Sequence, residues 1–165
     1  MMLDTISLRR WYLAVAVSCA ALLGYALYIQ YHDFLDPCPL CIIQRVAFIW
    51  IGAAALLALL LKPARLGQRL YSWLIALGAG FGAAVAGRHV WLQQLPAEQV
   101  PECGPGLNYM LDNFPLSEVL STVLRGSGSC AETDWTFIGL SMPAWALAWF
   151  LGLGIITLWF TYRKA

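Results

Sequence analysis

Four long apolar runs constrain the fold of this chain more than any other feature. They cover residues 11–30, 41–61, 71–90 and 142–162. A helix of about twenty residues rises about 30 Å, which is the thickness of the hydrocarbon core of a bilayer. With 61% hydrophobic and only 12% charged residues, the chain is too apolar for an ordinary soluble domain. The sequence therefore predicts an all-α membrane protein, a four-transmembrane-helix bundle that forms one membrane domain over residues 1–165.

The third apolar run is rich in glycine and alanine. Gly78 and Gly82 lie four residues apart, as do Ala79 and Ala83, so each pair shares one face of a helix. Rows of small residues let helix backbones approach closely in lipid. We expect this run to pack tightly against its neighbours.

Basic residues lie on one side of the predicted bundle. Seven of the ten are Arg9, Arg10, Lys62, Arg65, Arg69, Arg163 and Lys164. The positive-inside rule places residues 1–10, 62–70 and 163–165, and with them both termini, in the cytoplasm. Loops 31–40 and 91–141 then face the outer side. The net charge is only +1, and we expect no nucleic-acid partner.

The long outer loop contains one segment with helical periodicity. Its apolar positions are Leu116, Val119, Leu120, Val123 and Leu124, and its polar positions are Ser117, Glu118, Ser121 and Thr122. This spacing predicts a short amphipathic helix. Two placements suit it: on the surface of the bilayer, or as a cap over the end of the bundle.

A C-x-x-C pair lies where a polar turn meets the second apolar run. Pro37 and Pro39 favour a helix start here, because a first turn does not need the N–H that proline lacks. Cys41 would lie in that first turn, beside free N–H groups and the positive end of the helix dipole. Arg45 follows one turn later on the same face. We therefore predict a redox-active dithiol, Cys38 and Cys41, at the mouth of a transmembrane helix.

Two further cysteines lie in the long outer loop. Proline and glycine surround Cys103, and glycine and serine precede Cys130. Four cysteines on the outer side suggest two disulfides, since disulfides persist outside the cytoplasm, and three pairings are open. A Cys103–Cys130 bond in a flexible loop would be easily reduced, which would make it one half of a relay. Cys19 lies inside the first apolar run, and we expect it to be a packed core residue.

Two motifs resemble the disulfide bond formation protein B (DsbB) family of bacterial inner membranes. The first is Pro37-Cys38-x-Leu40-Cys41-Ile42-x-x-Arg45. The second is Gly128-x-Cys130-Ala131-Glu132-x-x-Trp135-x-Phe137-x-Gly139-Leu140-x-Met142-Pro143. The likeness covers nearly the whole chain. Pro39 and Gln44 depart from the family pattern, and we expect them to shift the redox poise.

The resemblance implies an enzyme, a quinone-dependent protein-dithiol oxidoreductase needed for disulfide formation in exported proteins. It would reoxidise a DsbA-like periplasmic thiol oxidase and pass the electrons to membrane quinone (ubiquinone or menaquinone), and so to the respiratory chain. By this likeness the partner attacks Cys103, and Cys130 is the leaving thiol. Cys130 then attacks Cys38, and Cys41 reduces the quinone.

The resemblance also implies binding residues and a location. Arg45 would stabilise the Cys41 thiolate and hold the quinone. His89 would lie near the quinone head group and help with protons; the alternative is an interface histidine that only hydrogen-bonds. Trp135 would approach the quinone or belong to the aromatic belt at the membrane surface. The implied location is the inner membrane, in contact with lipid, with multiple spans, both termini cytoplasmic and the active cysteines periplasmic.

Two other classes of protein remain as alternatives. In a zinc protein, the four outer cysteines would hold a tetrahedral ion. The loop pair is not a second C-x-x-C, however, and an oxidising compartment disfavours free thiols, so we expect no metal. Haem attachment is excluded because Ile42, not histidine, follows the second cysteine. A scaffold stapled by disulfides would leave Arg45, one turn beyond Cys41, unexplained.

Overall fold

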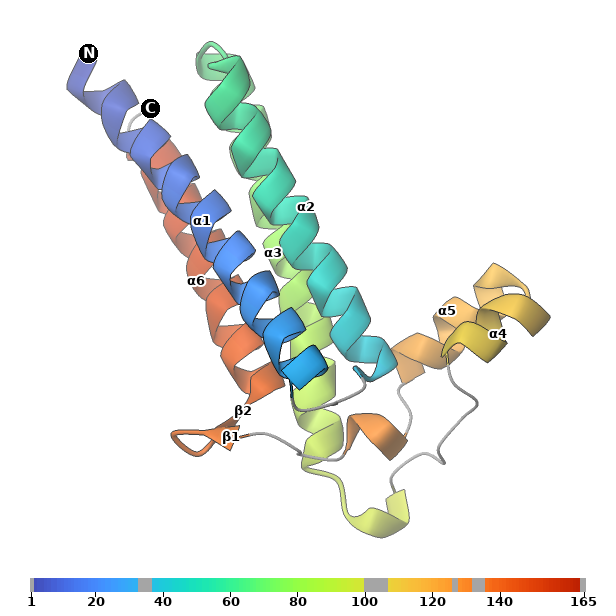
Figure 1. Ribbon diagram of the computed structural model, residues 1–165. Helices are drawn as coiled ribbons and strands as arrows, with labels where there is room; N and C mark the ends of the chain where they lie inside the picture. The colour runs from blue at the N-terminus through green and yellow to red at the C-terminus, as the bar shows by residue number, and fades with distance from the viewer. Residues whose placement is uncertain (1, 33–36, 100–106, 126–127, 132–135, 164–165) are drawn as a thin grey trace.

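Four long helices form the body of the protein. The computed structural model describes residues 2–32, 37–99, 107–125, 128–131 and 136–163. The long helices are α1 (Met2–His32), α2 (Pro39–Leu61), α3 (Arg65–Gln93) and α6 (Met142–Tyr162), and they run side by side (Figure 1). All four are long and apolar enough to cross a membrane. The predicted four-helix membrane architecture is confirmed.

Three of the four long helices, α1, α2 and α3, extend beyond the apolar runs that predicted them, whereas α6 has the predicted bounds. α1 begins at Met2 and ends at His32, and α3 occupies Arg65–Gln93 rather than residues 71–90. Most of the predicted loop 62–70 is thus the first turns of α3. The turn between α2 and α3 is short because Lys62 ends α2 in the left-handed conformation, with φ of 46°. A hydrophobicity pattern reports what lipid covers, whereas hydrogen bonding continues a helix into the polar region.

Helix α3 is the centre of the bundle, and its small residues explain why. It packs against both α2 and α6. The ring of Phe150 on α6 is fully buried against Gly82, where any Cβ atom would overlap it. The same ring stacks on Phe48 of α2, with centroids 4.1 Å apart. Gly82 therefore lets three helices meet around one aromatic pair, as the row of small residues predicted.

The segment between α3 and α6 adds short elements at one end of the bundle. They are the 3₁₀ turn η1 (Ala97–Gln99), the helices α4 (Leu107–Asn113) and α5 (Leu116–Arg125), and the 3₁₀ turn η2 (Gly128–Cys130). A hairpin of β1 (Thr136–Phe137) and β2 (Leu140–Ser141) follows, with Thr136 opposite Ser141. This hairpin was not predicted, because strands of two residues are too short to show an alternating pattern of apolar and polar residues.

The amphipathic helix predicted in the loop is α5. Helices α4 and α5 project sideways from the start of α2 (Figure 1). Among the described side chains of α5, Val119 and Val123 are buried, and they pack with Met110 of α4 and with Ile43 of α2. These contacts hold the loop against the mouth of α2, while Leu116 stays 79% exposed.

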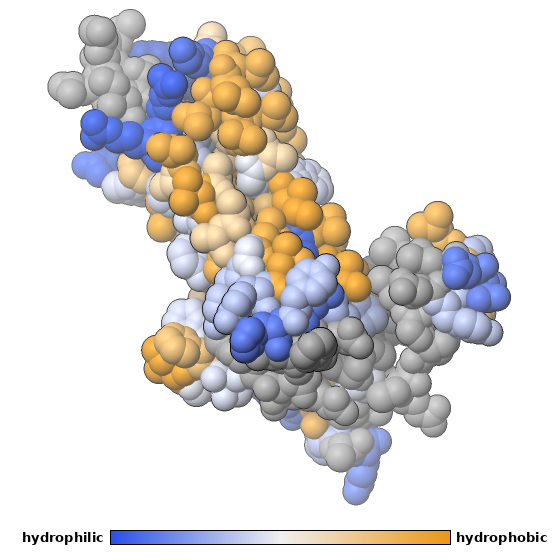
Figure 2. Space-filling view, viewed as in Figure 1, coloured by the Kyte–Doolittle hydropathy of each residue, from blue (hydrophilic) through white to orange (hydrophobic). Residues whose placement is uncertain are grey.

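The outer surface of the bundle suits lipid. Figure 2 shows hydrophobic side chains over much of the visible side of the helices, with hydrophilic side chains towards the ends. Large apolar side chains such as Leu60 and Ile155 are about two-thirds exposed, at 64% and 65%. Such exposure is costly in water but not in a bilayer.

Candidate active site

The start of α2 is built around the C-x-x-C pair. Pro39 is the first helical residue, and Cys38 is the N-cap, with extended φ and ψ of −63° and 159°. The backbone N–H of Cys41 donates to the sulfur of Cys38 across 3.4 Å. The two sulfur atoms are 3.2 Å apart, compared with about 2.05 Å in a disulfide. Cys38, rather than Cys41, is thus the sulfur that satisfies the backbone at the helix start.

His89 of α3 lies directly beside this pair. It is only 2% exposed, and its Nε2 is 3.7 Å from the sulfur of Cys38. Its Nδ1 is 3.1 Å from Nε2 of Gln44, one turn into α2. When the Gln44 amide donates to Nδ1, the neutral imidazole carries its proton on Nε2, which faces Cys38. His89 is therefore placed to exchange a proton with the Cys38 sulfur.

Cys130 completes a cluster drawn from three parts of the chain. The sulfurs of Cys38 and Cys130 and a ring nitrogen of His89 all lie within 4.8 Å of one another. Cys130 is fully buried and packs with Leu40 and Leu92, which shield this end of the bundle from water. Two sulfurs this close can exchange a disulfide bond with small movements, and an adjacent imidazole can serve the protons.

Arg45 forms hydrogen bonds to α1. Its guanidinium donates to the side-chain oxygen of Gln30 and, across 3.3 Å, to the carbonyl oxygen of Ala26. It remains one turn beyond Cys41 on α2, as its sequence position required. These two bonds link α2 to α1 near the site, a role for Arg45 that was not predicted from the sequence.

The structure brings four of the seven predicted site residues together: Cys38, Cys41, Cys130 and His89. Cys103 and Trp135 lie outside the described residues, so the Cys103–Cys130 pairing and the place of Trp135 stay predictions. Gln44 was missed as a site residue. Its signal in the sequence was a polar side chain in an apolar run, which was interpreted only as a departure from the family pattern.

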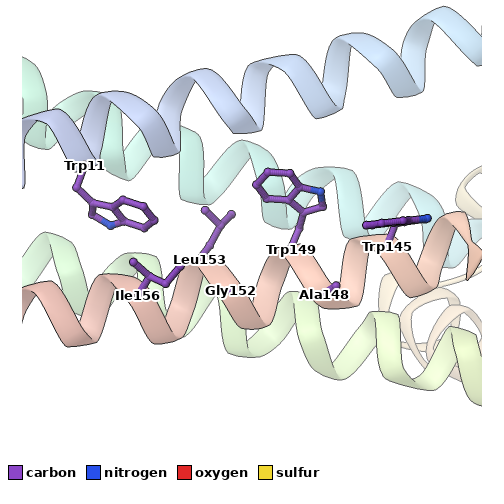
Figure 3. Close-up of a pocket in the computed structure, with 7 residues that line it drawn as sticks. All are labelled: Trp11, Trp145, Ala148, Trp149, Gly152, Leu153 and Ile156. Atoms are coloured by element: carbon purple, nitrogen blue, oxygen red, sulfur yellow. The ribbon is translucent and has the colours of Figure 1, made fainter. Parts of the chain in front are cut away.

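An apolar groove runs between α1 and α6. It has a cavity of about 220 Å³, bordered by Trp11 of α1 and by Trp145 and Trp149 of α6, with Gly152 among its lining residues (Figure 3). Gly152 has no neighbour within 4 Å of the place a Cβ would take. A groove walled by indole rings suits an apolar chain better than a polar ligand.

Comparison with known proteins agrees with this geometry. The family described as disulfide bond formation protein DsbB matches residues 8–160. A protein of Methylococcus capsulatus named disulfide bond formation protein B is 53% identical over 155 residues, covering 92% of this chain and 93% of its own. Proteins of the same name from Nitrosococcus oceani and Chromobacterium violaceum are 54% and 47% identical, over 86% and 94% of this chain and 83% and 94% of their own. The chain therefore belongs to the DsbB family of disulfide bond formation proteins.

Proposed function

We propose that this protein is a disulfide oxidoreductase of the bacterial inner membrane that reoxidises a DsbA-like thiol oxidase and reduces membrane quinone. The active cysteines face the periplasm, and both termini face the cytoplasm. The names of its relatives support a role in disulfide bond formation. The charge distribution of the loops supports the orientation.

The observation that carries the proposal is the position of Cys130. Its sulfur lies within 4.8 Å of the sulfur of Cys38, although the two residues are far apart in the sequence. A relay requires this contact, because thiol–disulfide exchange proceeds by direct attack of a thiolate on a sulfur atom.

The electrons move by two exchanges. A partner thiolate attacks Cys103 of a Cys103–Cys130 disulfide, and Cys130 leaves as a thiolate. Cys130 then attacks Cys38 of a Cys38–Cys41 disulfide, and Cys41 leaves. Once the second partner thiol has resolved the mixed disulfide, the partner is oxidised and the chain holds two more electrons and two more protons. His89, 3.7 Å from Cys38, would serve the proton transfers at that sulfur.

The acceptor is proposed to be a membrane quinone, which would take up these two electrons and two protons. Arg45 is the cation nearest to Cys41 along α2, and its bonds to Gln30 and Ala26 hold it at the α1–α2 contact. The groove that also borders α1 would accept the apolar tail (Figure 3). His89 and Trp135 are the other proposed contacts of the head group.

A reconstituted turnover assay tests this function. The protein is purified in detergent and mixed with a reduced DsbA-like oxidase and a soluble quinone analogue, whose absorbance falls as it is reduced. We expect turnover that survives a metal chelator. The Cys130→Ser variant should not turn over. Mixed with the oxidised partner instead, its Cys103 thiolate should attack the partner's disulfide, release one partner thiol and form a mixed disulfide, visible on a non-reducing gel.

The matched control is Cys19→Ser, which alters a cysteine of the bundle core. We expect it to turn over like the unaltered chain. Absence of turnover with all five cysteines intact would count against the relay and favour a structural role for the disulfides. A trapped complex on Cys130→Ser with no quinone reduction by the unaltered chain would retain the partner and reject the acceptor.

A further inference from the structure

We propose that the reduced protein binds a thiophilic divalent cation, with Zn²⁺ as the type, between Cys38, Cys130 and His89, and that the bound ion holds the relay in its reduced state. This ligand set differs from the four cysteines considered from the sequence, because it keeps only Cys38 and Cys130 and adds His89. The ion is an inhibitory ligand rather than a resident cofactor, so the relay itself needs no metal.

The geometry of the cluster is close to that of a zinc site. Two thiolate sulfurs about 2.3 Å from a tetrahedral Zn²⁺ lie about 3.8 Å from each other. Here the three candidate ligand atoms lie within 4.8 Å of one another, and Nε2 of His89 is 3.7 Å from the sulfur of Cys38. A contraction of about 1 Å or less would bring all three atoms to bonding distance.

Gln44 can supply the second ring nitrogen of His89 with the kind of partner that zinc ligands use. Metal-bound histidines usually donate their other N–H to an oxygen, which fixes the ring and its tautomer. The Gln44 amide is 3.1 Å from Nδ1, and a half-turn of that amide would present its oxygen instead of its nitrogen. Gln44 is itself only 5% exposed, so its position is held by packing.

Burial and charge also favour the ion. Leu40, Val85 and Leu92 pack around Cys130, and isolated thiolates there would be costly. One Zn²⁺ balances the charge of two thiolates, and the two thiol protons pass to solvent on binding. Cys38 is only partly buried, which leaves the ion a route to the cluster from the end of the bundle.

Binding of this kind depends on the redox state. The thiolate is the ligand, and a cysteine in a disulfide has none to offer. Only the fully reduced chain therefore supplies both sulfurs. The ion then binds the sulfurs of Cys38 and Cys130, whose exchange carries the electrons, and so blocks the relay. This inhibition rests on the proposed function, whereas the binding of the ion does not.

A zinc titration tests the site. The full chain is reduced in detergent, freed of reductant without oxygen, and titrated with Zn²⁺ against a chromophoric chelator. We expect one ion per chain, with affinity at least about tenfold weaker in Cys130→Ser and in His89→Gln, since each loses a ligand. Cys19→Ser should bind like the unaltered chain. Equal binding by Cys130→Ser and the unaltered chain, or by the oxidised and the reduced chain, would overturn the proposal.

Two variants of Gln44 leave all three ligands in place, which covers the case that His89→Gln fails to fold. Glutamate at this position should tighten zinc binding and leucine should weaken it, by about tenfold or more for leucine. With Co²⁺ in place of Zn²⁺, the absorption from thiolate to cobalt should appear in the unaltered chain and be lost in Cys130→Ser. No such absorption in the unaltered chain, or the same affinity for Gln44→Glu and Gln44→Leu, would contradict the site.

The turnover assay then tests the inhibition separately. Zn²⁺ should stop quinone reduction by the unaltered chain, and a chelator should restore it. If zinc binds but turnover continues unchanged, the inhibitory role is rejected and the binding site stands. If turnover is absent even without zinc, the proposed function fails, while the titration still decides whether the cation binds.

Discussion

Cys19 and the Cys38–Cys41 pair lie in contrasting settings, and the contrast explains why the proposed chemistry uses the pair and not Cys19. Cys19 is 1% exposed in the apolar core. It lies so close to α2 that a Cβ atom added to Gly52 would be 3.1 Å from the Cβ atom of Cys19. Cys38 and Cys41 lie at a helix end, beside a backbone N–H and an imidazole. Burial among apolar atoms disfavours a thiolate, whereas hydrogen-bond donors stabilise it. Reactivity here is a property of the setting, not of the residue type.

The largest expected difference between these settings is catalytic. Cys41→Ser should lower the rate of quinone reduction by about 10³-fold or more, because the loss of one residue that acts as part of a catalytic unit costs about as much as the loss of the whole unit. It should still form the mixed disulfide with the partner through Cys103. Cys19→Ser should keep its turnover. The quinone assay measures both, and comparable losses from the two variants would remove the distinction between core and site.

The next effect concerns the core alone. Gly82→Ala should destabilise the bundle by about 1–3 kcal/mol, because the new methyl group overlaps the buried ring of Phe150. Gly80→Ala is the matched control on the same helix, since nothing lies within 4 Å of its Cβ position. Unfolding in a detergent titration compares the two. Equal stability of the two variants would mean that the rings of Phe48 and Phe150 can move aside at little cost, so that the core is not closely packed around Gly82.

A smaller effect is expected where the site depends on its surroundings. Gln44→Leu should slow turnover about tenfold, because it leaves Nδ1 of His89 without its buried partner, a loss of about 1–3 kcal/mol. Gln44→Glu should retain most of the rate, since it keeps a hydrogen bond to the ring. The dependence of the rate on pH should change in Gln44→Leu if the histidine proton is used. A pH profile identical to that of the unaltered chain would reduce Gln44 to a packing role.

The smallest effect is expected at the acceptor. Arg45→His should raise the apparent KM for the quinone about fivefold with kcat nearly unchanged, because imidazole cannot make both bonds of the guanidinium to α1. Arg69→His is the control, an exposed position in the first turns of α3. Steady-state kinetics with varied quinone separates KM from kcat. An unchanged KM would argue that Arg45 only ties α1 to α2.

Much of the fold could be predicted from local pattern, because lipid imposes a simple rule on each span. The length of the apolar runs predicted α1, α2, α3 and α6, and helical periodicity predicted α5. The helix ends were less accurate, since hydrogen bonding continues past the apolar limit at both ends of α3. The β1–β2 hairpin could not be predicted, because it depends on a turn at Ile138 and Gly139, both with positive φ, and not on a periodic strand.

For the site, the sequence by itself determined the chemistry of single segments. Proline, two cysteines and an arginine at fixed spacing were enough to predict a dithiol at the start of α2, because neighbours within one helical turn are set by backbone geometry. Only the tertiary structure decided that His89 faces Cys38, that Gln44 orients His89, and that Cys130 joins them. Those contacts join segments far apart in the chain. The packing of α3 against α2, and of η2 against α3, brings them within reach, and no local preference does so.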